Sequence, residues 1–136
     1  MVVEHLDKPQ QVFAEFSRVC RPGGLVVLAT PNLLHYATLI TALTSFGFQR
    51  WFLQHVLGGR CQCFPTRYRA NTPKKLAKVM EGAGFTTVEV RCVDDGPAYL
   101  DWLTPAYAAG LIYHRLVTSA KIFSSFRRVL IGAFHC

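Results

Sequence analysis

The sequence predicts an α/β fold, and three observations carry that prediction. An amphipathic helix is followed by a Pro-Gly-Gly turn and then by a wholly apolar run, Leu25 to Ala29. A later helix ends in a glycine-rich segment and leads into an alternating strand at residues 86–93. The 136 residues are 51% hydrophobic and 17% charged, which excludes a disordered chain and fits one domain. A helix that feeds directly into a buried strand is typical of half a βαβ crossover.

The first helix is expected to begin at Asp7 and to end before Pro22. The Asp7 carboxylate can accept the free N–H groups of a first turn, and Pro9 falls in that turn, where its missing N–H is harmless. Apolar residues then recur at the spacing of one helical face, at Val12, Phe13, Phe16, Val19 and Cys20. The apolar run at 25–29 is typical of a strand covered on both faces of a parallel sheet.

Several short motifs together resemble the class I S-adenosylmethionine-dependent methyltransferases. They are the Glu4-His5-Leu6 turn, Glu15 with Arg18-Val19-Cys20, the RPGG turn and the Thr30-Pro31-Asn32 exit. The resemblance resumes at residues 68–90, where YRANT, an amphipathic helix, AGF and an alternating strand follow one another. In that family the EHL turn follows the fourth strand of a Rossmann-like sheet, and the strands at 25–29 and 86–93 would be the fifth and sixth. The resemblance implies methyl transfer from S-adenosylmethionine to a small-molecule acceptor.

The resemblance covers only the C-terminal half of that fold, because the family's first strand and its glycine-rich cofactor loop have no counterpart here. Gly23-Gly24 is not that loop, since it follows a helix and enters a strand, whereas the cofactor loop follows a strand and opens a helix. We therefore expect residues 1–136 to form a single partial methyltransferase domain. Met1 is then an internal methionine of a longer enzyme or a gene-model start, and the isolated chain does not methylate by itself.

Leu33 to Leu57 is a long apolar segment with Arg50 as its only fully charged residue. Its length would suffice for a transmembrane helix, but its threonines, its glycine and the α/β context on both sides oppose that interpretation. We expect one or two helices over the sheet edge, within a variable helical cap at 33–66 that the resemblance implies shapes the acceptor pocket. The alternative is a membrane-surface helix with Arg50 and Trp51 at the interface.

A second helix is expected to start with Thr72 as its N-cap and Pro73 at its first position. Its apolar face comprises Leu76, Val79, Met80 and Ala83, and Gly84 suits a left-handed cap. In the strand that follows, alternation predicts that Val88, Val90 and Cys92 face the core.

The last third of the chain is expected to contain a helical region and a strand. Residues 99–120 have helical periodicity, and Pro105 divides them because it cannot continue a helix interior. The apolar run at 129–134 resembles the family's last strand, which runs antiparallel and inserts between the fifth and sixth.

The formal net charge is +7, with the excess mainly between Arg50 and Arg91. We interpret this as a solvated face, or as a patch that a missing acidic half of the protein would balance. The alternative is a patch that faces a nucleic acid, an anionic membrane or an anionic small substrate. We expect no nucleic-acid partner, because no motif with a known docking geometry is present. The five cysteines are odd in number, and we expect reduced thiols in a cytoplasmic protein. His55, Cys61 and Cys63 do not have the spacing of a structural zinc site, so no metal is expected.

Two residues are the strongest site candidates by position. Glu4 and His5 follow a strand tail, at the sheet edge where ligands bind in open α/β folds. The resemblance to methyltransferases implies that both residues lie at the S-adenosylmethionine site. His5 is also a candidate general base, because imidazole titrates near neutrality. The alternative for His5 is a hydrogen bond to a loop backbone.

Candidate acceptor-binding residues are Thr30, Asn32, Tyr36, Arg67 and Tyr68. For the first two the alternative is formation of the Thr-Pro-Asn turn, and for the other three it is packing or surface exposure. Arg67 would suit a carboxylate or phosphate, because a guanidinium makes paired hydrogen bonds to such groups. Oxygen, nitrogen and carbon acceptors all stay open.

Two other functions stay open. One is a non-catalytic partner that binds an intact methyltransferase subunit through the open sheet edge beside residues 1–3. The other is a peripheral membrane protein that uses residues 33–57.

Overall fold

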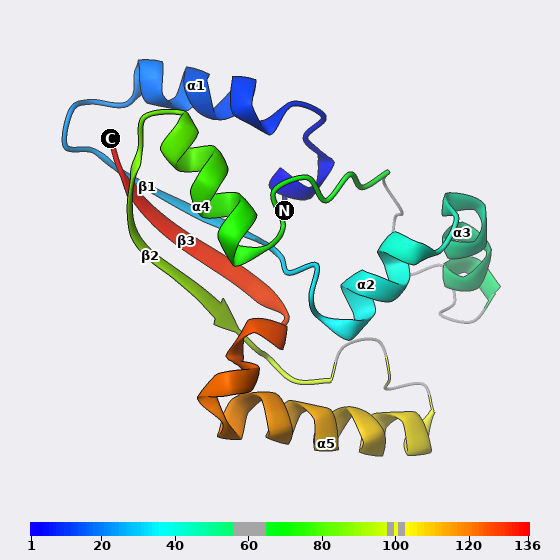
Figure 1. The fold of residues 1–136 in the computed structure, drawn as a ribbon. Helices are drawn as coiled ribbons and strands as arrows, with labels where there is room; N and C mark the ends of the chain where they lie inside the picture. Colours follow the sequence, from blue (N-terminus) through cyan, green and yellow to red (C-terminus); the bar gives the residue numbers. More distant parts are fainter. Residues whose placement is uncertain (56–64, 98–99, 101–102) are drawn as a thin grey trace.

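The computed structural model describes residues 1–55, 65–97, 100 and 103–136 (Figure 1). Its three strands are β1 (Leu25–Pro31), β2 (Thr86–Val93) and β3 (Val129–His135). They form one sheet in the order β1-β3-β2, with β3 antiparallel to both neighbours. The mixed α/β class predicted from the sequence is confirmed, and so is the antiparallel insertion of the last strand between the two earlier ones.

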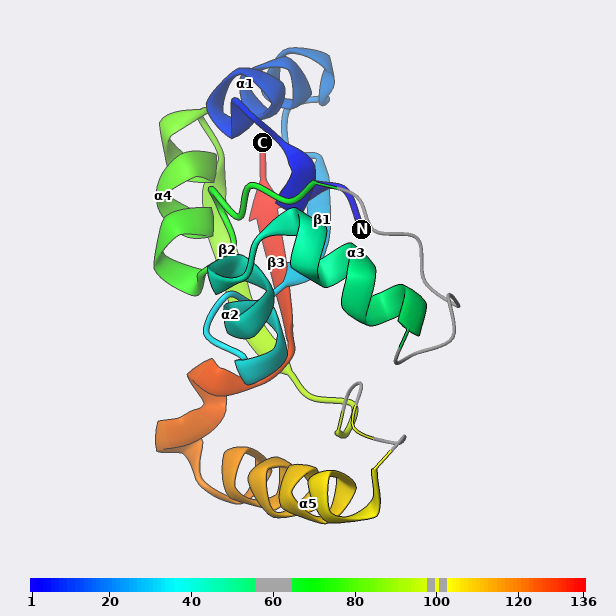
Figure 2. The same ribbon diagram turned by 90° about the vertical axis from the view of Figure 1, so that its right-hand side faces the viewer.

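The middle strand provides the centre of the core. Leu130 and Phe134 are fully buried, and they alternate with residues of the opposite face. The helices α1 (Pro9–Val19) and α4 (Pro73–Gly82) pack against this face of the sheet (Figures 1 and 2). The core consists of Val3, Phe13, Ala70, Leu76, Met80, Phe85, Leu130 and Phe134.

The expectation that β1 is covered on both faces is wrong for this structure. Val26 and Leu28 pack on the core, but Leu25 and Val27 are 56% and 61% exposed. Because α1 and α4 lie on the same side of the sheet, the side chains on the other face of β1 have no cover among the described residues (Figure 2).

The start of α1 also differs from the prediction. The N-cap is Lys8, which makes no side-chain capping bond, and Pro9 occupies the first turn as expected. Asp7 is not the cap; its Oδ1 instead forms an ion pair with Nε of Arg67, 2.9 Å away. The helix ends at Val19, three residues before Pro22, in agreement with the prediction.

The second predicted helix agrees closely with α4. The Thr72 hydroxyl accepts a hydrogen bond from the Lys75 amide at 3.3 Å, and Pro73 opens the helix. Leu76 and Met80 are fully buried. Gly84 has a φ of +94°, the left-handed conformation predicted for the cap.

The strand β2 has the predicted bounds, but Val88 does not face the core. It is 53% exposed, because the pairing with β3 shifts register between Thr87 and Glu89 and leaves Val88 as the extra residue of a β-bulge. Beyond the bulge the alternation is restored, and Val90 and Cys92 pack on the core as predicted.

The apolar segment after β1 forms two short helices, α2 (Tyr36–Leu43) and α3 (Phe46–His55), which confirms the one-or-two-helix prediction. Residues 56–64 of the expected cap lie outside the described residues. Farther along, α5 (Thr104–Ser119) has Pro105 in its first turn and is followed by a 3₁₀ helix, η2 (Lys121–Phe126). Within the described parts of the chain, no helix is both long and apolar enough to cross a bilayer.

The tight packing around Gly132 yields a stability prediction. A Cβ at this position would lie 2.5 Å from Cε2 of Phe134 and 3.2 Å from Cδ2 of Leu76, both in the core. We expect Gly132→Ala to lower the free energy of unfolding by about 1–3 kcal/mol, the usual range for overpacking. Urea denaturation followed by circular dichroism measures it.

The matched control is Gly82→Ala at the end of α4, where a Cβ meets nothing within 4 Å. This change is expected to leave the stability unchanged or to raise it by about 0.5–1 kcal/mol, because alanine favours the helix. Equal losses in the two variants would contradict the packing argument.

Candidate functional site

Three segments far apart in the sequence meet at the C-terminal end of β1. They are the 3₁₀ turn η1 (Val3–His5), the end of β1 itself and the segment 65–71. The carbonyl of Glu4 accepts hydrogen bonds from the amides of Arg67 (2.7 Å) and Tyr68 (3.2 Å). The carbonyl of Asn71 accepts one from the Leu33 amide at 2.8 Å. These backbone bonds fix the loop beside the sheet edge at which Glu4 and His5 were predicted to lie.

Two side chains in this cluster, Glu4 and Asn71, have a buried oxygen without a hydrogen-bond partner among the described residues, and Glu4 is the one that can carry a charge. Glu4 is 6% exposed, and the oxygen concerned is its Oε2. Its Oε1 lies 3.8 Å from Nε2 of His5. A buried carboxylate oxygen without a donor is costly, so the geometry suits a ligand that brings a hydroxyl or an ammonium group.

His5 makes the loop hydrogen bond considered as its alternative role. Its Nδ1 lies 2.7 Å from the carbonyl oxygen of Pro65, and because a carbonyl can only accept, Nδ1 carries the proton. In the neutral ring this leaves Nε2, on the Glu4 side, as the basic nitrogen. The loop bond therefore orients the ring, and it is compatible with a general base at Nε2.

Tyr68 has a strained backbone next to Glu4. It is the one non-glycine residue with a positive φ, +48°, among the described residues. A bulky residue in the left-handed region costs about 1–3 kcal/mol, and such strain is concentrated at functional sites. The preceding residue, Arg67, is 56% exposed at its side chain and pairs with Asp7.

Thr30 and Asn32 are fully buried, and the protein itself occupies their polar groups. The Thr30 hydroxyl accepts a hydrogen bond of 2.6 Å from Nδ2 of Asn71. The Asn32 amide donates to the carbonyls of Ser125 and Arg127, both at 2.7 Å. These hydrogen bonds connect the end of β1 to segments distant in the sequence and hold it in place.

Tyr36 lies in an aromatic cluster between α2 and α5. Its ring centroid is 4.2 Å from that of His35 and 4.9 Å from that of Tyr113. The structure thus brings Glu4, His5 and Tyr68 together at one place and packs Tyr36 against α5.

The sequence analysis missed His35, which is 1% exposed. Its Nδ1 accepts a hydrogen bond from the Ala37 amide at 3.3 Å, so His35 caps α2. Burial lowers the pKa of His35 from its usual value, an effect that Asp94 opposes and Arg128 reinforces. The only indication in the sequence of a capping role was that His35 precedes a helical segment. That indication is weak, because histidine is not among the preferred N-cap residues.

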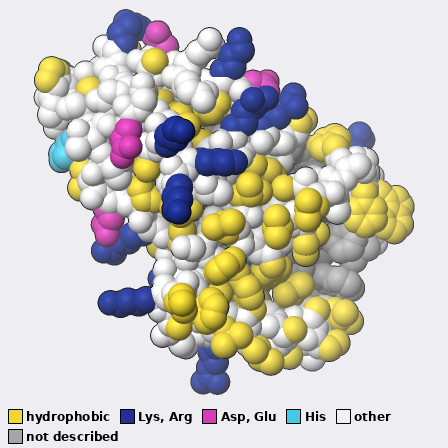
Figure 3. Space-filling view, viewed as in Figure 1, with side chains coloured by type: hydrophobic (Ala, Val, Ile, Leu, Met, Phe, Trp, Pro, Cys, Tyr) yellow, Lys and Arg dark blue, Asp and Glu magenta, His cyan; other side chains and the backbone are white. Residues whose placement is uncertain are grey.

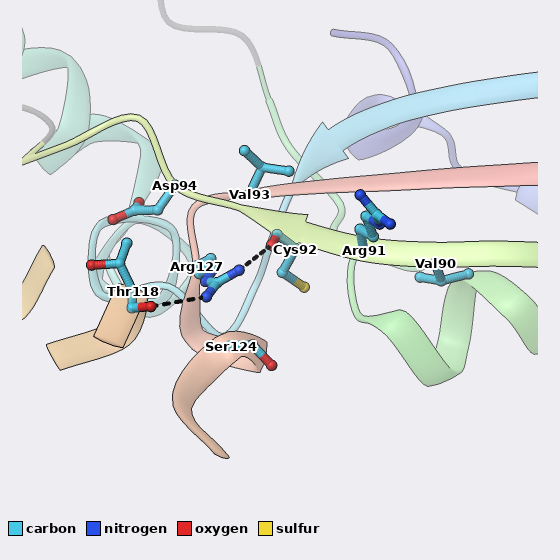
Figure 4. A pocket seen from close by; sticks show the side chains of 8 residues that line it. All are labelled: Val90, Arg91, Cys92, Val93, Asp94, Thr118, Ser124 and Arg127. Atoms are coloured by element: carbon cyan, nitrogen blue, oxygen red, sulfur yellow. Dashed lines mark hydrogen bonds between the residues drawn. The ribbon is translucent and has the colours of Figure 1, made fainter. Parts of the chain in front are cut away.

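Away from this cluster, a hollow of about 480 Å³ lies between β2, the end of α5 and η2 (Figure 4). Two basic residues, Arg91 and Arg127, line it. The Arg127 guanidinium donates to the carbonyls of Val117 (3.0 Å), Thr118 (3.4 Å) and Cys92 (3.4 Å). Arg127 therefore satisfies carbonyls at the end of α5, and its donors are used for structure.

Cys20, Cys92 and Cys136 are free thiols. The predicted absence of a zinc site concerned His55, Cys61 and Cys63, and the two cysteines lie outside the described residues. Elsewhere in the chain, across the described ranges, no three His, Cys, Asp or Glu side chains gather as metal ligands.

Residues 1–28 match the family model described as "Methyltransferase domain". The match begins before η1, includes Glu4 and His5, and runs through α1 into β1. It confirms the resemblance to class I S-adenosylmethionine-dependent methyltransferases in this part of the chain. No curated protein sequence matches the chain.

The strain at Tyr68 can be tested by comparing two truncations. Glycine adopts a positive φ without cost, whereas alanine does not, so we expect Tyr68→Gly to be at least as stable as Tyr68→Ala. At an ordinary position glycine is less stable than alanine by about 0.5–1 kcal/mol. Urea denaturation of both variants measures the order, and the ordinary order would contradict the strain.

The burial of His35 predicts a pH dependence of stability. Because the folded-state pKa lies below the unfolded value of about 6.5, the unfolded chain binds the extra proton first. The His35 contribution is therefore fully present above that value and is lost as the pH falls below it, with a slope of up to about 1.4 kcal/mol per pH unit.

The variant His35→Asn keeps an acceptor for the Ala37 amide but does not titrate. We expect it to show a flatter stability profile than the wild type between pH 7 and 5, measured by thermal denaturation. Identical profiles would show that His35 is not the group responsible.

Proposed function

We propose that this chain is the C-terminal part of an S-adenosylmethionine-dependent methyltransferase that acts on a small-molecule acceptor, and that this part is inactive alone. The observation that carries the proposal is the buried Glu4 carboxylate, one oxygen of which has no donor within the described parts of the chain. It lies at the end of β1, within the segment that matches the methyltransferase domain.

The sheet supports the same proposal. The order β1-β3-β2 with an antiparallel middle strand is the order that the resemblance gives for the fifth, last and sixth strands of the family. β1 pairs with β3 on one side and with no other described strand, so its outer edge is available for a fourth strand. Its uncovered face, with Leu25 and Val27, is available for further helices. Both features favour a partial Rossmann-like sheet.

The residues present fit the cofactor in part. The Glu4 oxygen suits the hydroxyl or ammonium groups of S-adenosylmethionine, which when bound supplies an electrophilic methyl group. His5 would take a proton at Nε2 from an acceptor that must lose one. Tyr68 and Arg67, next to Glu4, would orient the acceptor, and positioning supplies much of the rate in a direct displacement.

Glu4→Gln tests this assignment in a longer protein that contains this chain. Loss of the charged acceptor is expected to weaken S-adenosylmethionine binding at least tenfold, because hydrogen bonds to charged groups contribute about 1.5–3 kcal/mol. Isothermal titration calorimetry measures the binding. The control is Glu15→Gln on the surface of α1, whose exposed carboxylate pairs with Arg18 and is expected to leave binding unchanged.

The isolated chain of residues 1–136 is expected to bind no S-adenosylmethionine in the same assay. Methylation by this chain alone would overturn its assignment as an inactive part. Unchanged affinity in Glu4→Gln would remove Glu4 from the cofactor site.

The open edge of β1 also favours a second candidate, a non-catalytic partner of an intact methyltransferase subunit. An unpaired strand edge is a template for pairing with another chain. The nucleotide sequence upstream of the Met1 codon separates the two candidates. A long open reading frame that encodes a strand followed by a glycine-rich turn supports the C-terminal part of a longer enzyme. An immediate stop codon supports the non-catalytic partner.

A further inference from the structure

The helices of this protein expose two different kinds of surface. On α4 the exposed side chains include Lys74, Lys75 and Lys78, as is usual for a helix that packs one apolar face on a core. On α2, α3, α5 and η2 the exposed side chains are largely apolar. Among the most exposed are Leu43 (78%), Trp51 (52%), Ile112 (64%), Leu116 (57%), Ile122 (79%) and Phe126 (43%). We call these six residues the apolar surface.

Side-chain contacts fix the elements of the apolar surface to one another. The Tyr113 ring on α5 packs edge-on against Tyr36 on α2, with centroids 4.9 Å apart, and its hydroxyl donates to the Phe126 carbonyl of η2 at 2.7 Å. Nε2 of Gln49 on α3 donates to the Thr41 and Thr44 carbonyls at the end of α2 (2.6 and 2.9 Å). Figure 3 shows hydrophobic side chains gathered over the half of the molecule where α2 and α5 lie. The surface is therefore preformed.

The charged residues on the four helices of the apolar surface are all basic, and the nearest described carboxylates, Asp94 and Asp95, are paired with His114 and Arg128. No aspartate or glutamate occurs anywhere from Phe16 to Met80, and none follows Asp101. The helices α2, α3, α5 and η2 thus carry no carboxylate, whereas Arg50, Arg115 and Lys121 on them are exposed. Such a surface is complementary to a partner that is apolar inside and negative outside.

We propose that the apolar surface docks this protein onto a lipid bilayer that contains anionic headgroups. The aliphatic side chains enter the boundary between headgroups and acyl chains, and Trp51 lies at the level that tryptophan prefers. Arg50, Arg115 and Lys121 contact lipid phosphates. No described helix is long enough to cross the bilayer, so the contact is peripheral. This docking does not depend on methyl transfer.

Flotation with vesicles tests the proposal on the chain of 136 residues. We expect the protein to float with vesicles of phosphatidylcholine mixed with phosphatidylglycerol and to bind pure phosphatidylcholine much more weakly. The triple variant R50Q/R115Q/K121Q is expected to lose roughly five-fold in partition for each cation removed. The variants Leu43→Gln and Ile122→Gln are each expected to lose about tenfold, because each removes an apolar side chain that enters the lipid.

The control removes the same amount of charge from the opposite end of the molecule. Lys8, Arg18 and Arg21 are exposed on and beside α1, far from α5 (Figure 1). The variant K8Q/R18Q/R21Q is expected to keep its partition within about two-fold, since surface attraction falls off within a Debye length. An equal loss in both triple variants would overturn the proposal, because binding would then follow net charge alone.

Two further results would also overturn it. One is failure of the wild-type chain to float with the anionic vesicles. The other is a stable dimer in sedimentation equilibrium without lipid that Leu43→Gln and Ile122→Gln convert to monomer, because a second copy would then cover this surface. Both substitutions are at exposed positions, and circular dichroism verifies that the variants are folded.

Discussion

The fold depends on the pairing of β3 with both of its neighbours. β1 and β2 do not pair with each other, so the sheet exists only because β3 lies between them. The same strand supplies Leu130 and Phe134, two fully buried side chains in the core under α1 and α4. Backbone pairing and hydrophobic burial are therefore concentrated in one seven-residue segment, and the helices acquire a surface to pack on only when that segment is in place.

Two buried asparagines connect the candidate site to this sheet and determine its geometry. Asn71 connects the start of α4 to Thr30 and Pro31 at the end of β1. Asn32 connects the same strand end to the carbonyls that precede β3. With both connections made, the loop that binds the Glu4 carbonyl has a defined position. Glu4 can then remain buried with an unsatisfied oxygen, because the surrounding hydrogen bonds stabilise the arrangement.

Local patterns in the sequence predicted the elements whose ends are set by neighbouring residues. Thr72, Pro73 and Gly84 specify both ends of α4, and the resemblance supplied the antiparallel place of the last strand. The failures involve partners distant in sequence. Asp7 pairs with Arg67 and does not cap α1, and a bulge opposite β3 turns Val88 outward. For the site, position alone placed Glu4 and His5 at the sheet edge. The burial of Thr30 and Asn32 depends on contacts with Asn71 and with the segment before β3, which no local pattern encodes.

The distance in sequence between β1 and its partner has a consequence for synthesis. Leu25 pairs with His135, so about a hundred residues must be added before the first strand meets the third. At elongation rates of 5–20 residues per second, the edge of β1 that pairs with β3 stays unpaired for roughly 5–20 s. During that interval two nascent chains on one messenger present the same apolar strand to each other. Association of unfinished chains during this interval would lower the yield of this protein, and chaperones that bind extended apolar segments would act at this stage.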